Sequence, residues 1–309
     1  MGADFAAFKT FLDRQQDLLH GALVIPRSDL DASTKNFLIF DATLFLPGSK
    51  EEKDVRQQLK DFFTRDPDKV KELHRIEGKT PEQYADNFIE RMQNPSLANN
   101  GGGGAHVGSG ILYFDSFATN LHTQISQFTG KIEDKNSIAE GQFDRFVSYH
   151  EGAHLMLEVK EAGADFMATA LMLQKYPNSR DTLESVADLR NLQWMSDMND
   201  NDGTEHGSEC HDAIQYALHM SPEELHGMSV NDLHNIAIRF DRETMDNNIT
   251  LNNGEKAVAE EFKKSGLKGS FEKALENIFL PEDSPGNTLL DSMRESIDRL
   301  KAPVQARTP

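Results

Sequence analysis

Residues 148–154 read Ser-Tyr-His-Glu-Gly-Ala-His, and no other stretch of the sequence gathers chemically active side chains so compactly. Residues four apart lie one above the other on a helix, so His150 and His154 project from one face and can offer two imidazole nitrogens to one metal ion. Glu151 projects elsewhere and can act as the general base that takes a proton from an attacking water. The stretch therefore predicts a metal-binding helix.

The flanking sequence favours a helix independently of the histidines. Ser137 and Glu140 have the spacing of a capping box, which marks a helix start. From Phe143 to Leu157, apolar residues recur at three- and four-residue spacing, and the two histidines fall on this stripe. Such a stripe is expected to face the core, where metal ligands belong. The alternative is a helix that buries two histidines without binding a metal.

The next segment places Glu161, Ala164, Asp165 and Ala168 in the order Glu-x-x-Ala-Asp-x-x-Ala. His-Glu-x-x-His followed by this order resembles the zincin metallopeptidases over about residues 148–173. The resemblance implies a zinc-dependent peptidase (Zn²⁺) whose second element supplies the third metal ligand. Glu161 is that ligand in the gluzincin pattern, with Asp165 in support, and Asp165 is the ligand in the aspzincin pattern. The gap before Glu161 is shorter than in gluzincins, and the glycine-threonine turn of aspzincins is missing.

Helix geometry bears on the third ligand. In an unbroken helix Glu161 would stand about 10 Å along the axis from His154, which is too far to share a metal. The chain is therefore expected to turn at residues 158–160 and return as a second helix. This path favours Asp165 as the ligand, because it lies one turn into the returning helix, whereas Glu161 could reach only from the turn. The unused carboxylate would then hydrogen-bond a ligating imidazole. Alternatively, both are ordinary acids at a helix start.

His211 is a further candidate site residue. It lies near the start of a helix that Ser208 is expected to cap. A helix N-terminus favours negative charge, so His211 could donate to the transition-state oxyanion or provide the third metal ligand instead. Tyr149 and Tyr113 are the other candidates for the oxyanion. The alternative for His211 is a surface histidine at a polar helix start.

Composition limits the possible partners. The chain has 309 residues and a net charge of −19, which disfavours binding to nucleic acid or to an anionic membrane surface. Its single cysteine, Cys210, excludes an internal disulfide and fits a reducing compartment. No signal-peptide pattern and no apolar stretch of membrane-spanning length is present. We therefore expect a cytoplasmic protein, or one exported without a cleavable signal peptide. No pattern predicts an oligomeric state.

The expected fold is mainly α with a small β-sheet, in a zincin-like architecture. Strands are predicted within residues 37–45 and 111–114, and helical patterns dominate elsewhere. Residues 1–280 are expected to form the metallopeptidase domain, and residues 281–309 a linker, a helix and a disordered tail.

The predicted reaction is zinc-dependent hydrolysis of peptide bonds in a peptide or protein substrate, with Glu151 as general base. One alternative keeps the site but hydrolyses a non-peptide amide. The other is a non-catalytic helical interaction protein in which the histidine motif is structural.

Overall fold

The computed structural model describes residues 2–20, 22–28, 36–41, 48–65, 80–93, 103–106, 110–114, 121–130, 137–197, 208–245, 253–265 and 271–302. The fold is mainly helical with a small mixed sheet, as the sequence predicts. None of the helices in these ranges is long and apolar enough to cross a bilayer. The tail from residue 303 onward lies outside the described ranges.

The chain divides into two compact units. Unit 1 comprises Met1–Thr119 and Val147–Glu158, and unit 2 comprises Asn120–Phe146 and Val159–Pro309. The chain crosses from one unit to the other within helix α6 (Ser137–Leu157) and again after Glu158. The expected domain boundary at residue 280 stays a prediction.

The elements of unit 1 before α6 are, in chain order, α1 (Phe5–Arg14), the 3-10 helix η1 (Gln15–His20), β1 (Ala22–Pro26), β2 (Asn36–Asp41), α2 (Lys50–Arg65), α4 (Pro81–Gln93), β3 (Gly103–His106) and β4 (Ile111–Phe114). The described strands form one sheet in the order β1-β2-β4-β3. Strands β2 and β4 are parallel, and both outer pairs are antiparallel. The strand predicted at residues 111–114 is β4, and the strand predicted within residues 37–45 corresponds over residues 37–41 to β2, whereas residues 42–45 lie outside the described ranges.

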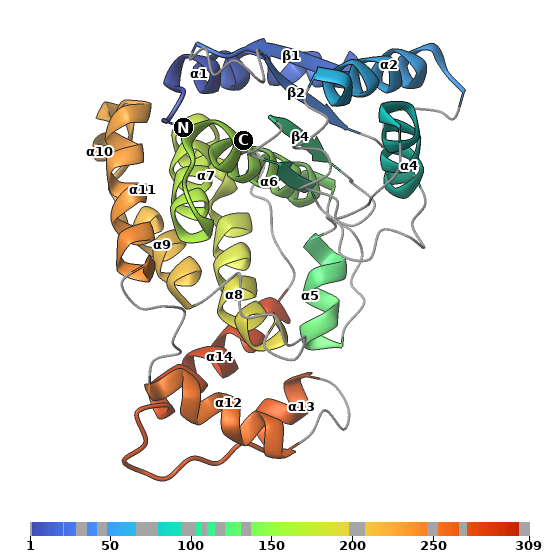
Figure 1. Cartoon of the computed structure of the whole chain (residues 1–309). Helices are drawn as coiled ribbons and strands as arrows, with labels where there is room; N and C mark the ends of the chain where they lie inside the picture. Colours follow the sequence, from blue (N-terminus) through green and yellow to red (C-terminus); the bar gives the residue numbers. More distant parts are fainter. Residues whose placement is uncertain are drawn as a thin grey trace. The chain divides into compact units, whose positions relative to one another are not determined.

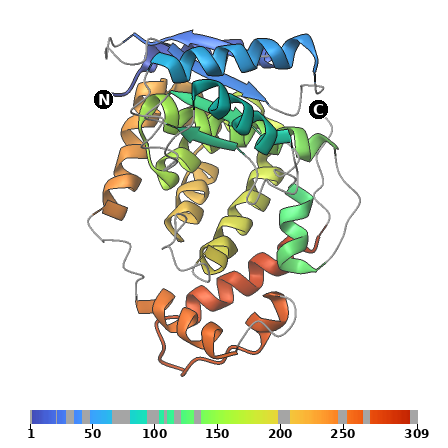
Figure 2. The same ribbon diagram turned by 45° about the vertical axis from the view of Figure 1, so that its right-hand side comes forward.

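Strand β2 is central, which explains its continuous apolar run. Residues Phe37 to Phe40 are all buried, because both faces of the strand are covered. On one face, Leu38 and Phe40 pack with Ile111 of β4 against α2 and α4 (Figure 2). The side chains of Phe37 and Ile39 point to the other face of the sheet. They share this face with Leu23 and Ile25 of the neighbouring strand β1, and α1 packs beside β1. The burial of β1 alternates along the strand, so one of its faces is covered and the other is open, and the strand order places β1 at an edge of the sheet.

The regular elements within the described residues of unit 2 are all helices. Its elements outside α6 are α5 (Leu121–Thr129), α7 (Glu161–Lys175), the 3-10 helix η3 (Pro177–Ser179), α8 (Arg180–Asp197), α9 (Ser208–His219), α10 (Pro222–Gly227), α11 (Val230–Met245), α12 (Asn253–Ser265), α13 (Phe271–Glu276) and α14 (Asn287–Leu300).

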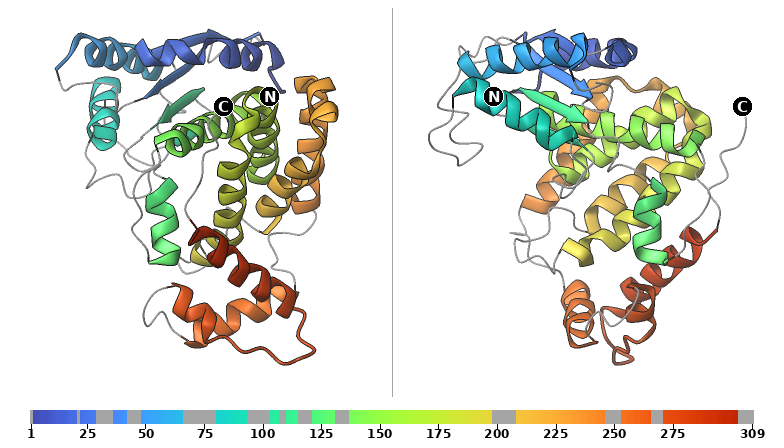
Figure 3. Two further views of the ribbon diagram at one scale, coloured as in Figure 1. Left: turned by 180° about the vertical axis from the view of Figure 1, so that it is seen from behind. Right: turned by 90° about the vertical axis from the view of Figure 1, so that its right-hand side faces the viewer.

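Helix α7 is the core of unit 2. Every residue from Ala162 to Leu173 is buried, as expected for a helix that is packed on all sides. Helices α9 and α11 lie beside it (Figure 1). Helix α8 packs on α9, and α14 contacts α8, α12, α13 and α5 (Figure 3).

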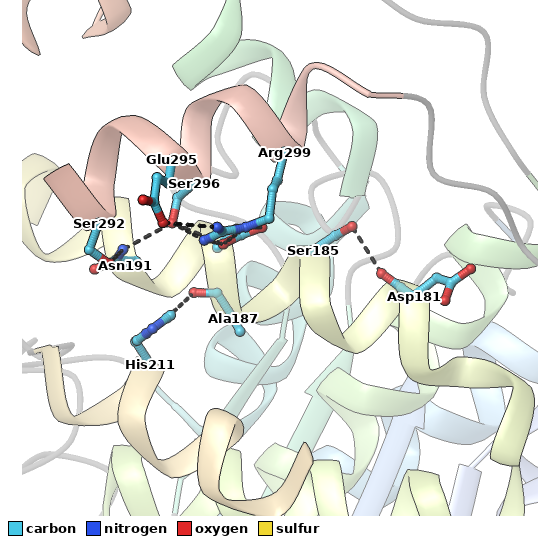
Figure 4. A network of polar contacts seen from close by, with 10 residues as sticks. Asp181, Ser185, Ala187, Asn191, His211, Ser292, Glu295, Ser296 and Arg299 are labelled. Carbon is cyan, nitrogen blue, oxygen red and sulfur yellow. Dashed lines mark hydrogen bonds and ion pairs between the residues drawn. The ribbon is translucent and has the colours of Figure 1, made fainter. Parts of the chain in front are cut away.

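A polar network joins α14 to α8 (Figure 4). The buried carboxylate of Asp188 accepts hydrogen bonds from Arg299 and from the Ser296 hydroxyl at 2.7–3.1 Å. The Asn191 amide donates to Ser296 and Ser292 at 2.9 and 3.0 Å. The burial of Asp188 is therefore compensated by a charged partner and a hydroxyl.

Candidate metal centre

Helix α6 carries the histidine motif, as predicted, and α1 packs along its second half. The Asp4 N–H donates to the Met156 carbonyl at 2.7 Å. The Gln15 amide donates to the Ser148 hydroxyl at 3.2 Å. These bonds fix α1 against the motif at two points of α6, one before Glu151 and one after it.

Gly152 allows α1 to approach α6. A Cβ atom at this position would lie 2.3 Å from Cε1 of Phe11, whose ring is fully buried. Real Cβ atoms do not tolerate so short a contact, so the close packing of the two helices requires glycine here. The residue between Glu151 and Ala153 is therefore set by packing in unit 1.

The chain turns directly after α6. The helix ends at Leu157, and Glu158 adopts a φ of 54°, in the left-handed region that glycine usually occupies at helix ends. A non-glycine residue there costs roughly 1–2 kcal/mol. Lys160 is extended, and α7 begins at Glu161. The predicted turn at residues 158–160 is confirmed.

The side chains of His150 and His154 converge. Their Nε2 atoms lie 2.9 Å apart, and their ring planes are nearly perpendicular. One ligand atom each from His150, His154 and Glu161 all lie within 4.8 Å of one another. His150 is buried, and the other two are half-buried. Within the described residues, these three form the group that could hold a metal ion.

The donor set and its spacing fit zinc. Around a tetrahedral Zn²⁺ with bonds of about 2.0–2.1 Å, neighbouring ligand atoms lie about 3.3 Å apart. The two imidazole nitrogens are within a few tenths of an ångström of that separation. The Glu161 carboxylate oxygen lies no more than 4.8 Å from the ligand nitrogen of each histidine. To reach the ligand separation of about 3.3 Å it would have to move by at most about 1.5 Å, which a small rotation of the glutamate side chain allows.

Asp165 does not join this group but pairs with Arg190 of α8. Nε of Arg190 lies 2.8 Å from Oδ2 of Asp165, and Nη2 donates to Oδ1 at 3.1 Å. Asp165 is fully buried, and a buried carboxylate needs such a partner. The sequence favours Asp165 as the third ligand, whereas the structure brings Glu161 to the histidines. The reason is that α7 begins directly after the turn and directs Asp165 toward α8.

Arg190 is the counter-charge of a buried acidic group. Burial lowers its pKa, but the charges of Asp165 and Glu161 and the hydrogen bond to Asp165 outweigh burial and leave the pKa raised. The guanidinium therefore stays protonated. Burial and the nearby Asp165 raise the pKa of the Cys210 thiol, so this cysteine is not a nucleophile at neutral pH.

The remaining predicted site residues are not members of this ligand group. Glu151 is half-buried, and no hydrogen bond or ion pair to its carboxylate is found in the described part of the chain. Nδ1 of His211 lies 2.9 Å from the carbonyl oxygen of Ala187 on α8. The ring of Tyr149 is buried in the core. The side chain of Tyr113 lies outside the described part.

Arg190 is not among the site residues that the sequence predicts. A signal is present, because Val186, Arg190 and Trp194 are spaced four apart on α8 and the first and last are buried. A cation on a buried stripe implies a carboxylate partner. The sequence does not say which of the many acidic residues that partner is.

The histidine pair with Glu161 has the ligand order that the gluzincin resemblance implies. Its support is the convergence of the three side chains at a turn between two helices. Compared with protein-family models, curated proteins and solved structures, the chain matches none.

Proposed function

We propose that this protein is a zinc-dependent metallopeptidase. The observation that carries the proposal is the convergence of the two Nε2 atoms, 2.9 Å apart, with the Glu161 carboxylate. Two imidazoles and a carboxylate are the protein ligands of many catalytic zinc sites, which keep a fourth position open. A purely structural zinc site would need a fourth protein ligand, and the described residues bring none to the group.

Glu151 is the proposed general base. It follows His150 on α6, and its carboxylate is free of ion pairs in the described part of the chain. A bound Zn²⁺ would act as a Lewis acid that polarises a carbonyl oxygen and makes water more acidic. Glu151 then takes the proton of the attacking water and returns it to the leaving amine. The proposal leaves His211 as a candidate donor to the oxyanion.

Metal content tests the proposal first. The protein purified without chelator should hold about one zinc per chain, and His150→Ala or His154→Ala should abolish binding because too few ligands remain. His226→Ala is the matched control, since this histidine is exposed on the short helix α10. A native protein that carries no zinc and whose melting temperature does not rise when zinc is added would refute the proposal. That result would favour a metal-free interaction protein.

The general-base role of Glu151 is tested separately with Glu151→Gln. The amide matches the carboxylate in shape but cannot accept the proton, so zinc content should stay native while peptide cleavage falls by several orders of magnitude. Both should be measured on one preparation. Wild-type turnover in this variant would remove Glu151 from the general-base role. Product analysis distinguishes peptide cleavage from hydrolysis of a non-peptide amide.

The third ligand is tested with Glu161→Ala and Asp165→Ala. The first should remove most of the zinc affinity. The second should chiefly lower stability, by about 3–5 kcal/mol, because it leaves Arg190 buried without its partner. Zinc titration and urea denaturation of both variants measure the two effects. The opposite pattern would assign the metal to Asp165.

A further inference from the structure

Helix α7 begins without a side-chain cap of its own. Its N-cap residue is Lys160, which makes no capping hydrogen bond through its side chain. The first N–H groups of a helix have no partner within the helix, so a buried start needs an acceptor from elsewhere. Glu161 is the first residue of α7, and its position depends on how this start is held.

The acceptor is Asp241 of α11. Its Oδ2 accepts from the Lys160 N–H at 2.8 Å, and its Oδ1 accepts from the Gly163 N–H at 3.0 Å. A capping box satisfies these same two backbone positions with two side chains of the helix itself. Here one carboxylate makes both bonds from 78 or more residues away in the sequence. The two bonds bracket Glu161 on either side.

Gly163 lets the carboxylate come this close. A Cβ atom at this position would lie 2.7 and 2.9 Å from the two Asp241 oxygens and 3.0 Å from the carbonyl oxygen of Ala237. No side chain larger than hydrogen fits without displacing Asp241 or the backbone of α11. Asp241 is itself buried, at 7% exposure, so it cannot swing into solvent.

We propose that Asp241 is a positioning residue, which fixes the first turn of α7 so that Glu161 is presented to the position on which His150 and His154 converge. This inference rests on the proposed zinc site. Asp241 acts on the metal through Glu161, so its contribution to zinc affinity requires the Glu161 carboxylate.

A double-mutant cycle tests this dependence. Zn²⁺ affinity, measured by competition with a chromophoric chelator, is compared for the native protein, Asp241→Asn, Glu161→Ala and the double variant. In Asp241→Asn one of the two N–H groups faces an amide N–H₂ instead of an oxygen. We expect this variant to lose about 10-fold in affinity, as is typical when a residue that supports a metal ligand is changed. In the Glu161→Ala background the same change should cost less than about threefold.

Two further variants control for stability. Asp232→Asn removes a carboxylate that accepts two hydrogen bonds from Ser229 at the start of the same α11, and it should leave zinc affinity within about twofold of native. Gly163→Ala perturbs the Asp241 carboxylate without changing any charge, so it decides the question if Asp241→Asn unfolds. It should weaken zinc binding only when Glu161 is present.

The outcomes separate the two proposals. Equal losses of affinity in both backgrounds, or native affinity in Asp241→Asn and Gly163→Ala, would overturn the positioning role and leave the zinc site standing. Absence of zinc binding in the native protein would overturn both. A loss of zinc affinity that occurs when Glu161 is present, and not in the Glu161→Ala background, supports the inference.

Discussion

Gly152→Ala tests how α1 packs on α6, the helix that carries His150 and His154. Intrinsic helix propensity alone predicts a gain, since alanine is favoured over glycine by about 1 kcal/mol within a helix. The structure predicts a loss. The new Cβ would lie 2.3 Å from Cε1 of Phe11 and 3.0 Å from two further ring atoms. Ordinary contact between carbons begins at about 3.5 Å, so the ring or the helix must move by roughly 1.2 Å.

The size of the loss follows from the surroundings of the ring. Phe11 is fully buried, so the ring has no solvent to move into. Overpacking of this kind costs about 1–3 kcal/mol, and the large displacement places this site near the upper end. Subtracting the gain in propensity leaves a net destabilisation of about 2 kcal/mol.

Urea denaturation followed by circular dichroism, with chelator present, measures the change without any contribution from a metal. Gly141→Ala is the matched control on the same helix, because nothing lies within 4 Å of its added Cβ. This variant should gain up to about 1 kcal/mol. Phe11→Leu in the Gly152→Ala background should recover part of the loss by making room. If Gly152→Ala stabilises the protein as much as Gly141→Ala does, the packing argument is wrong.

Three further changes test other parts of the fold. Glu158→Gly should stabilise the protein by up to about 1 kcal/mol, because glycine adopts the left-handed φ of 54° without strain; a loss of stability in thermal melts would contradict this. Arg299→Ala should cost about 1–3 kcal/mol, because Asp188 stays buried without its cation but solvent partly screens the half-exposed Arg299, and Arg299→Lys should reduce this loss in urea denaturation. Asp4→Asn should lower the free energy of unfolding near neutral pH and remove the part of its pH dependence that comes from the Asp4 carboxyl. Burial raises the Asp4 pKa, but hydrogen bonds from Ser28 and Ala7 outweigh it and leave the pKa below 3.8. The stabilisation is therefore complete above pH 3.8 and is lost as the pH falls through the lowered pKa, which unfolding curves at several acidic pH values should show.

Parts of the sheet could not be predicted from local patterns. Strand β2 is apolar along its length because it is central, and this apolar run predicts a strand. Strand β3 begins with two glycines, which have low β propensity, and it exists through its pairing with β4. Edge strand β1 contains only five residues and ends in proline, so its alternation is too short to recognise. In both cases the neighbouring strand, not the local sequence, determines the structure.

The sequence by itself determines the helix that carries both histidines and the turn that follows it. The four-residue spacing of His150 and His154 places both rings on one face of any helix, and the rise of a helix excludes Glu161 from the same ion unless the chain turns. These conclusions depend only on backbone geometry over a few residues. They therefore hold before any tertiary contact is known, and the structure agrees with both.

Only the tertiary structure brings Glu161, and not Asp165, close to the two histidines. The choice depends on how α7 begins and which side it presents to α8, and both are set by residues distant in sequence. Asp241 holds the helix start from α11, and Arg190 binds Asp165 from α8. A buried carboxylate is stable only where a counter-charge or hydrogen-bond donors compensate for its lost hydration. Those partners come together only when the helices pack.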